Sequence, residues 1–399
     1  MYVMNRTAAL TRRSRAFPNS DRAMRILFLV SCVTAHDEKF VRSFSEAGHV
    51  VRIFSFHWRE VPEELLRLPN VTLTRIHLQF LARAQRFLPV HLLPRLQRVI
   101  REFRPDVMHA GNTWNEGYLA ALSGFHPLLV IPYGSDVLLD TQRSFLFRRA
   151  NRAVFRAADW VACDAEHVKR KIVADFGYPP EQITIFPKGI DVESIARLRD
   201  PLRATVRKEL DWEKHFVLVM SRNHEPVYGI DVFLRAMERV VKVEQRCRVL
   251  MMGEGSLTTG FKEWVSTHGM DDYFLWMGKI PRTDLLRLLQ AGDAYVSASL
   301  SDGTSVSLLE AMASRMPVVV SDVPSNLEWV QEGYNGEIFP RGDETTLASK
   351  ILMLAADPVR SQEYGNRNLA VVRKRGDWGR SYQELEMIYA RLIKKGKVQ

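Results

Sequence analysis

The stretch SDGTSVSLLEAMASRMPVVVSD, residues 301–322, combines a turn, a helix and a buried strand. Gly303, Thr304 and Ser305 supply turn and N-cap chemistry, so we expect the helix to begin near Thr304 or Ser305. The first N–H groups of a helix lack intrahelical partners and carry the positive end of its dipole. Small side chains at this position leave room for a phosphate group, which predicts a phosphate site at Gly303, Thr304, Ser305, Val306 and Ser307.

Two carboxylates, Asp302 and Glu310, accompany this predicted helix start. Glu310 lies about one and a half turns into the helix, where a carboxylate can accept hydrogen bonds from the vicinal hydroxyls of a ribose. The stretch therefore indicates a site for a nucleoside diphosphate. The structural alternative is that Asp302 only caps the helix and Glu310 lies on a solvated face.

The composition indicates a two-domain protein with anionic partners. A chain of 399 residues exceeds the usual size of one hydrophobic core. Its 56 Lys and Arg residues against 46 Asp and Glu residues give a net charge of +10, which favours phosphate groups, nucleic acid or an anionic membrane surface as partners. The three cysteines fit neither a metal site nor a disulfide framework and indicate a reducing compartment: Cys32, Cys163 and Cys247.

The first apolar run, ILFLVSCV at 26–33, follows an arginine-rich segment and is compatible with a secretory signal peptide. We interpret it as a first strand, because a helix-like segment and a second strand, HVVRIFSF at 49–56, follow it. Residues 1–23 are then expected to be a disordered tail, with Met24 as the true start. No run approaches the ~20 apolar residues of a membrane span.

Strand-like and helix-like runs alternate in two series, which is typical of parallel sheets wound with helices on both faces. The sequence thus predicts an α/β protein with two Rossmann-like domains facing across a cleft. Ligands of such sheets bind at the carboxyl ends of the strands, so the cleft is the expected site. The expected divisions are a first domain, a connector, a second domain and a final helix that packs back towards the first domain: 24–195, 196–214, 215–375 and 376–399.

Several motifs occur in an informative order: GSDV (134–137), PKGID (187–191), MSRNHEPVYGIDVFLRA (220–236), MMGEGS (251–256), MGKIPRTDLLRLLQAGDAYVSAS (277–299) and the run 301–340. In order and spacing this set resembles the retaining glycosyltransferases of family 4, which have the GT-B fold. The resemblance covers residues 24–399.

The resemblance implies a site for a nucleotide diphosphate-sugar in the second domain. Glu310 would hold the ribose, the helix mouth would meet the phosphates, and Arg222 matches a phosphate-binding arginine. An arginine at the end of a strand also suits bidentate phosphate recognition on physical grounds. The first acid of the pair, Asp302, would orient the hydroxyls of the donor sugar, although the family usually has glutamate there.

Three further positions belong to this predicted donor site. Lys279 and Ile280 match a segment that contacts the base through backbone groups. The glycine of GEG, Gly253, allows close backbone approach near the nucleotide rather than a dinucleotide fingerprint. The chain departs from the family at Tyr228, where a lysine is usual, so one positive charge on the diphosphate is missing or supplied elsewhere.

In the first domain the family's HGSD-like motif reads YGSD, with Tyr133 where a histidine is frequent. Asp136 is a catalytic candidate at this strand end, with a helix cap as the alternative. His109 also ends a strand and is expected to meet the donor or acceptor sugar, or else to be a structural histidine. His36 falls where the first strand turns into its helix, a position that faces the donor in GT-B enzymes.

The implied reaction moves a sugar, of the hexosyl type, from a nucleotide diphosphate-sugar to an acceptor hydroxyl with retention. It requires neither a metal nor an organic cofactor, and the leaving phosphate helps to deprotonate the acceptor. The acceptor is expected to be a glycan or a lipid-linked oligosaccharide in cell-envelope polysaccharide synthesis. A GT-B sugar-nucleotide epimerase, a phosphorylase and a non-catalytic sugar-nucleotide-binding subunit remain alternatives.

Residues 75–104 carry seven arginines and one glutamate among Phe and Leu. Basic amphipathic helices bind anionic membranes, so we expect a cytoplasmic enzyme that docks peripherally at the inner face of the membrane; a solvated helix face is the alternative. Nucleic acid is not an expected partner, because no recognised motif accompanies the positive charge. The sequence does not identify the base, the donor sugar or the acceptor.

Overall fold

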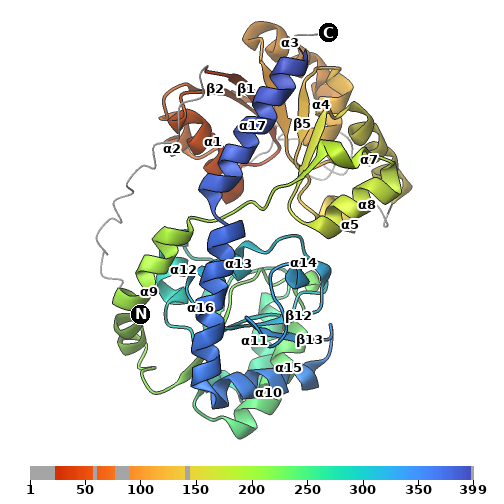
Figure 1. Cartoon of the computed structure of the whole chain (residues 1–399). Coiled ribbons are helices and arrows are strands. Elements are labelled where there is room, and N and C mark those ends of the chain that lie inside the picture. The colour runs from red at the N-terminus through yellow and green to blue at the C-terminus, as the bar shows by residue number, and fades with distance from the viewer. Residues whose placement is uncertain (1–22, 57–60, 77–89, 140–143, 397–399) are drawn as a thin grey trace.

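The protein, described by a computed structural model over residues 23–56, 61–76, 90–139 and 144–396, consists of two α/β domains (Figure 1). The predicted tail, residues 1–23, lies outside these residues except for Ala23. The segment expected to dock on membranes is described only at its two ends, up to residue 76 and from residue 90. None of the helices in the described residues has the length and apolar character needed to cross a membrane.

The N-terminal domain contains a seven-stranded parallel sheet in the order β3-β2-β1-β4-β5-β6-β7. Its short, β-branched strands are buried because helices cover both faces. The run that resembled a signal peptide forms β1. The strands are β1 (Arg25–Val30), β2 (Val50–Ser55), β3 (Val71–Arg75), β4 (Val107–Ala110), β5 (Leu128–Val130), β6 (Trp160–Cys163) and β7 (Ile183–Ile185).

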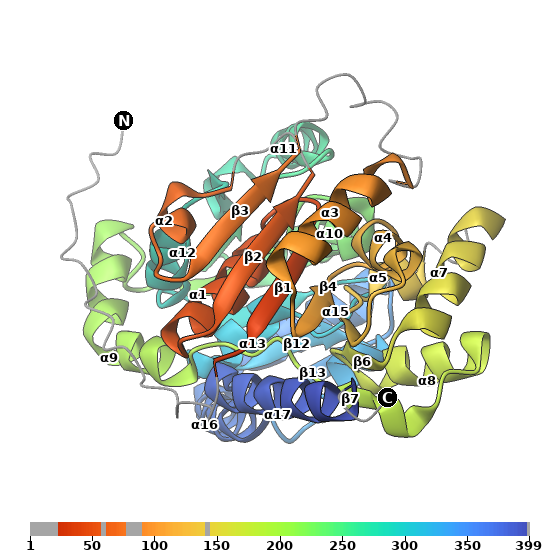
Figure 2. The same cartoon turned by 90° about the horizontal axis from the view of Figure 1, so that it is seen from above.

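Two groups of helices cover this sheet. One face packs against α3 (Leu93–Phe103), α4 (Glu116–Ser123), α7 (Phe145–Ala157) and α8 (Glu166–Phe176). The other face packs against α1 (Ala35–Glu46), α2 (Glu63–Leu66) and the C-terminal helix α17 (Trp378–Gly396). Seen from above, α17 lies across the sheet from α3 and α4 (Figure 2). The short helical segments are η1 (Val90–Leu92), α5 (Ser135–Leu138) and η2 (Pro180–Gln182).

The C-terminal domain contains a six-stranded parallel sheet in the order β10-β9-β8-β11-β12-β13. Its strands are β8 (Phe216–Met220), β9 (Cys247–Met252), β10 (Phe274–Gly278), β11 (Ala294–Ser297), β12 (Val318–Ser321) and β13 (Glu337–Phe339). One face packs against α10 (Ile230–Val243), α11 (Thr258–Thr267) and α15 (Glu344–Ala356). The opposite face packs against α9 (Val192–Glu209), α12 (Arg282–Leu289), α13 (Val306–Ala313) and α16 (Pro358–Arg375). Shorter segments are η3 (Pro226–Tyr228), η4 (Asp271–Tyr273) and α14 (Pro324–Leu327).

The chain crosses between the domains twice, and the two crossings are bonded to each other. The amide of Ile190 donates to the carbonyl of Gly376 over 2.8 Å, and the amide of Trp378 donates to the carbonyl of Ile190 over 2.9 Å. A Cβ atom at Gly189 would lie 2.9 Å from the backbone of Trp378, so this crossing requires glycine. Beyond the crossing, α17 packs on the N-terminal domain (Figure 1).

The segment expected as a connector, 196–214, lies largely within α9. Ile195, Ala196 and Val206 on this helix are buried in the core of the C-terminal domain. The segment is rich in charged residues because only one face of the helix is buried. Charge composition alone does not distinguish such a helix from a linker.

Candidate active site

The predicted phosphate arginine and the first predicted acid are in direct contact. Arg222 follows β8, Asp302 follows β11, and parallel strands bring their carboxyl ends to one edge of the sheet. Nη2 of Arg222 donates to Oδ2 of Asp302 over 2.5 Å. Burial lowers the pKa of the Arg222 guanidinium, but the nearby groups, Asp302 foremost, together raise it above its usual value. Burial raises the pKa of Asp302, and the charge of Arg222 counteracts that rise.

The helix α13 begins at Val306, with Ser305 as the N-cap whose hydroxyl accepts from the amide of Leu308. The same hydroxyl accepts from Nη1 of Arg222 over 2.5 Å, and the hydroxyl of Ser307 accepts from Nη1 over 3.2 Å. Arg222 is thereby aligned with the mouth of the helix. The structural alternative for Asp302 is excluded, because Ser305, not Asp302, caps the helix.

The ring of Tyr228, at the position where the family resemblance predicted a lysine, stacks against the guanidinium of Arg222. The guanidinium carbon of Arg222 lies 4.1 Å from the centroid of the Tyr228 ring. Such a cation–π contact contributes about 0.5–2 kcal/mol, more where water is excluded. Tyrosine at this position therefore places no positive charge in the site, and its ring holds the guanidinium of Arg222 in place.

Glu310 is buried, 3% exposed, on the second turn of α13. The solvated-face alternative for this residue is therefore wrong. Nη1 of Arg282, the first residue of α12, lies 2.5 Å from Oε1 of Glu310. Burial raises the pKa of Glu310, whereas the charges of Arg282 and of Lys39 in the N-terminal domain lower it. A buried carboxylate that senses a lysine of the other domain lies towards the interdomain cleft.

The mouth of α13 is also bonded to the N-terminal domain. The amide of Thr304 donates to Oδ2 of Asp164 over 3.2 Å, and its hydroxyl donates to the carbonyl of Asp164 over 2.5 Å. A Cβ at Gly303 would lie 2.6 Å from the Asp164 carboxylate, so only glycine permits this approach. Gly134, whose φ is +93°, lies against Gly303 from the same side.

In a second interdomain contact, the acceptor belongs to the C-terminal domain and the donors belong to the N-terminal domain. Glu328, at the end of α14, accepts from the amides of Glu166 and His167 over 3.0 and 3.2 Å. These amides belong to the first turn of α8, where a carboxylate is stabilised by the helix dipole. Asp164 and Glu328 thus bond the domains reciprocally, and we call this pair of contacts the interdomain latch.

Tyr133 and Asp136 are held by hydrogen bonds within the N-terminal domain. Asp136 is buried and accepts from the amide and hydroxyl of Thr113 and from the amide of Tyr133 over 2.8–3.1 Å. Its carboxylate therefore joins two strand-end loops, as the helix-cap alternative did not foresee, and its catalytic role stays a prediction. The hydroxyl of Tyr133 donates to Oδ1 of Asp37 over 3.2 Å, and Nζ of Lys188 lies 4.3 Å from the ring centroid.

The two predicted histidines occupy different environments. His109 is 1% exposed, its Nδ1 lies 2.5 Å from the hydroxyl of Tyr389 on α17, and Phe28 and Phe40 surround its ring. Its expected contact with a sugar is thus corrected, because the β4 register directs this side chain into the core beneath α17. His36 lies in the first turn of α1, and burial, followed by the charges of Lys188, Lys39 and Arg282, lowers its pKa to about 3.

The remaining predicted residues lie at the same edge of the C-terminal sheet. Gly253 has a φ of +130°, and a Cβ there would lie 2.2 Å from the carbonyl oxygen of Arg222. Its observed role is therefore the close packing of two strand-end loops. Lys279 is exposed and Ile280 packs partly against the core, directly after β10.

Two family profiles match this chain: Glycosyltransferase Family 4 over residues 35–194, and Glycosyl transferases group 1 over residues 203–369. The chain belongs to the group 1 glycosyltransferases. The predicted fold class is confirmed, because similar solved structures share the two-domain GT-B architecture. Anabaena HepE in complex with UDP-glucose matches with a TM-score of 0.77 at 17% identity, covering 92% of this chain and 100% of that one. Sucrose-phosphate synthase from Thermosynechococcus elongatus matches with a TM-score of 0.76 at 17% identity, over 93% and 100%.

The chain matches only part of each of two curated relatives. Sulfoquinovosyl transferase SQD2 of Arabidopsis thaliana is 25% identical over 332 residues, 80% of this chain and 63% of that protein. Phosphatidyl-myo-inositol mannosyltransferase of Mycobacterium leprae is 26% identical over 187 residues, 46% of this chain and 48% of that protein. The chain thus spans between about half and two thirds of these relatives.

Sequence reasoning missed several charged residues around the site of this glycosyltransferase. Arg282 begins a helix directly after the predicted base-contacting segment, and Asp164 follows the strand β6, so their positions at strand ends were available as signals. Lys188 lies in the motif PKGID, and its charge lowers the pKa of His36 and counteracts the effect of burial on the pKa of Asp164. Their convergence depends on how the two domains meet.

Proposed function

We propose that this protein is a retaining glycosyltransferase that moves a hexosyl group from a nucleotide diphosphate-sugar to an acceptor hydroxyl. The observation that carries the proposal is the alignment of Arg222 with the mouth of α13, with the buried Glu310 carboxylate one turn beyond it. A cation, the N-terminal end of a helix and a carboxylate in this order match a diphosphate followed by a ribose.

The chemistry that this arrangement supports is stabilisation of the leaving diphosphate. Negative charge develops there as the glycosidic bond breaks, and preorganised donors at such a position supply the largest electrostatic contribution. Nε of Arg222 is buried and has no hydrogen-bond acceptor among the residues that the structure describes. A phosphate oxygen would provide that acceptor.

The retaining stereochemistry rests on the family to which the chain belongs. In our proposal the acceptor attacks the face from which the diphosphate leaves, and a phosphate oxygen takes the acceptor proton. Asp302 orients the hydroxyls of the donor sugar and, through its contact with Arg222, links the sugar subsite to the phosphate subsite. No side chain serves as a nucleophile and no metal is required.

Because Tyr228 replaces the lysine expected beside the diphosphate, another residue must supply the positive charge there. Lys188, Lys39 and Arg282 are the cations whose charges lower the pKa of His36 at the start of α1. Lys39 is held in place by donating to the carbonyls of Lys188 and Gly189. We assign the compensating positive potential to this group of three, of which Arg282 belongs to the C-terminal domain and Lys39 to the N-terminal domain.

We further propose a lipid-linked acceptor and peripheral docking on an anionic membrane. The described part of the basic segment, α3, exposes Arg95, Arg98 and Arg101 while burying Leu96 and Val99. On the same face of the domain, the first turn of α7 exposes Phe145 by 75% and Leu146 by 62%, followed by two exposed arginines. Apolar tips ringed by cations suit the interface of an anionic bilayer.

The relatives support this choice of acceptor. The name of the Mycobacterium leprae protein gives a phosphatidyl-myo-inositol as the molecule that it mannosylates. A sugar acceptor embedded in the cytoplasmic leaflet would be presented to the cleft by a domain docked through α3 and α7. We therefore place this protein in cell-envelope glycan synthesis.

Ligand-induced stabilisation followed by product analysis tests the proposal. UDP, GDP and ADP and their sugar conjugates are added to the purified protein, and a ligand that binds only the folded state raises its Tm. We expect one nucleotide to raise the Tm and Glu310→Gln to reduce that shift, because the carboxylate no longer accepts from the ribose. NMR of the product should show the donor's anomeric configuration.

A negative result is equally informative. If no nucleotide shifts the Tm of the wild-type chain, or if Glu310→Gln and the wild type respond equally, the assigned donor site is wrong. An inverted product would refute the retaining mechanism while leaving the donor site intact. Glu254→Gln, at an acid beyond the assigned contacts, is the matched control.

A further inference from the structure

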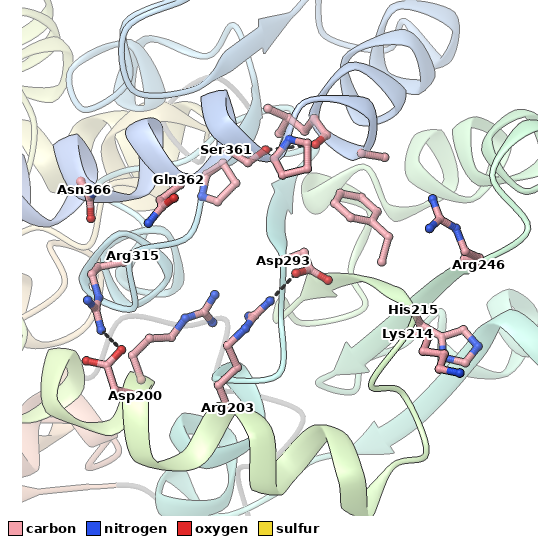
Figure 3. Close-up of a pocket in the computed structure, with 16 residues that line it drawn as sticks. Asp200, Arg203, Lys214, His215, Arg246, Asp293, Arg315, Ser361, Gln362 and Asn366 are labelled. Carbon is pink, nitrogen blue, oxygen red and sulfur yellow. Dashed lines mark hydrogen bonds and ion pairs between the residues drawn. The ribbon is translucent and has the colours of Figure 1, made fainter.

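A second cavity, of about 470 Å³, lies on the far side of the C-terminal sheet from the candidate active site (Figure 3). Phe216 at the start of β8, Asp293 before β11 and Pro317 before β12 line it, so it opens at the amino ends of the strands. Arg222 and Asp302 follow the carboxyl ends of β8 and β11. The two sites are therefore separated by the length of the sheet.

The lining of this cavity is strongly cationic. Among the described residues that line it, the cations outnumber the carboxylates: Arg199, Arg203, Lys214, Arg246 and Arg315 against Asp200 and Asp293. Arg199 and Arg203 are four residues apart on α9 and thus lie on one face of the helix. Together with Arg207, a further four residues on, they form an arginine row directed at the strand ends.

The two carboxylates of the cavity are already engaged. Asp293 accepts from Arg203, from Nη2 of Arg207 over 2.8 Å and from the amide of Val217 over 2.7 Å. Asp200 accepts from Arg315 (Figure 3). These ion pairs fix the wall of the cavity, and Arg246 is paired with Glu244 outside the lining, so the excess of positive charge rests on Arg199 and Lys214.

The pKa of Arg199 reflects this excess of positive charge. The side chain is buried, and its Nη1 donates to the carbonyl of Gln290 over 2.8 Å. Burial, followed by the charge of Arg203, lowers its pKa to about 9; Arg315 and Arg207 add to the effect, and Asp293 opposes it. An anion placed beside Arg199 would relieve both the desolvation and the repulsion.

The opposite wall offers uncharged polar groups. Ser361, Gln362 and Asn366 of α16 line it; Figure 3 shows Gln362 pointing towards the α9 side, while the hydroxyl of Ser361 donates to the carbonyl of Leu354 over 3.0 Å. Pro358, at the start of this 18-residue helix, also lines the cavity, which therefore lies beside the first turns of α16. Cations on one side and amide and hydroxyl groups on the other suit a ligand with a phosphate and several hydroxyls.

We infer that this cavity is a binding site for a phosphate ester of about the size of a sugar phosphate, held by Arg199 and Lys214 at the phosphate and by α16 at the hydroxyls. The volume lies within the range of about 300–1,000 Å³ typical of small-molecule sites. The ligand would join α9 and α16, which lead to the two bonded crossings at Ile190 and Gly376. A free sugar phosphate and a phospholipid headgroup share this chemistry.

Calorimetric titration tests the inference. Glucose 6-phosphate, glucose and vesicles containing phosphatidic acid are added to the wild-type chain and to Arg222→Ala, in which the candidate donor site is impaired. We expect glucose 6-phosphate or the vesicles, and not glucose, to bind both proteins. Binding of the soluble ester would identify a metabolite as the source, and vesicle binding that Arg199→Gln abolishes would identify a lipid in this cavity and not docking through α3 and α7.

Two substitutions on the same helix provide the decisive comparison. Arg199→Gln should weaken binding at least tenfold, whereas Arg197→Gln, at an exposed position of α9 outside the lining, should not change it. Lys214→Gln, at an exposed residue of the lining, gives a second reading if Arg199→Gln does not fold. Equal affinity in Arg199→Gln, Lys214→Gln and Arg197→Gln, or the absence of binding by both phosphate probes, would overturn the inference.

Discussion

Nη2 of Arg222 lies 2.5 Å from Oδ2 of Asp302, so the residue expected at the diphosphate and the residue expected at the donor sugar are bonded to each other. Both side chains are largely buried, and each shifts the pKa of the other towards its charged form. A charge pair of this kind keeps the guanidinium in a single orientation before the donor arrives. The site is thus preorganised for a leaving anion.

Removing the guanidinium should impair catalysis more than folding. In Arg222→Ala, we expect kcat/KM to fall about 10²–10³-fold, the loss typical of one donor to a developing anion. Release of nucleoside diphosphate in the presence of acceptor measures the effect. Arg239→Ala, an exposed arginine of the same domain, is the control; a loss of less than threefold in Arg222→Ala would contradict the assignment.

Tyr228 should act through its ring and not through its hydroxyl. Tyr228→Phe preserves the stacking 4.1 Å from Arg222, so its kcat should stay within about twofold of the wild-type value. Tyr228→Ala removes the stacking, and about 1 kcal/mol of lost support corresponds to a roughly fivefold lower kcat. Equal rates for the Phe and Ala variants would show that the ring does not position Arg222.

The interdomain latch should depend on pH through Asp164. Burial raises the pKa of this carboxyl to about 6 from 3.8, so between these values the folded state binds more protons than the unfolded chain. The contribution of Asp164 to the free energy of unfolding is therefore full at low pH and falls as the pH rises towards 6. The upper bound of this loss is about 3 kcal/mol.

Asp164→Asn isolates this contribution, since asparagine does not titrate but still accepts from the amide of Thr304. Relative to the wild type, the variant should gain stability as the pH rises from 4 to 6 and then remain at a constant difference. Urea unfolding at a series of pH values measures it, with Asp272→Asn at an exposed turn as the control. Parallel curves for Asp164→Asn and the wild type would refute a raised pKa.

Membrane docking should be lost when the basic face of α3 is neutralised. Joint substitution of Arg95, Arg98 and Arg101 by Gln removes about 1 kcal/mol of attraction per charge, or roughly 100-fold in partitioning. Cosedimentation with phosphatidylglycerol vesicles measures the binding. Three exposed cations of the C-terminal domain, replaced together, form the control: Arg239, Lys242 and Lys262. Equal loss in both variants would indicate non-specific charge attraction.

Substitutions in the first turn of α7 test membrane docking through the same surface independently. Phe145→Ser with Leu146→Ser leaves the net charge unchanged but removes the side chains available for insertion. We expect binding weaker than that of the wild type, with a deficit that remains at high salt, where electrostatic attraction is screened. Unchanged partitioning in this variant would limit the proposal to charge attraction alone.

The sequence by itself determined the alternation of strands and helices, the helix mouth at 303–307 and the positions of Arg222 and Glu310. These features follow from neighbours in the chain: apolar periodicity defines each element, and turn residues define where a helix starts. The ends of parallel strands then share an edge by construction, so Arg222 and Asp302 were predicted to lie in one site without any coordinates.

Only the tertiary structure decided which neighbours these residues meet. The pairing of His109 with Tyr389 arises because α17 returns to the first domain from the end of the chain. The contact of Arg282 with Glu310 and the latch at Asp164 likewise join residues that are distant in sequence. Strand order and the two domain crossings set these encounters, and neither is encoded in local periodicity or turn chemistry.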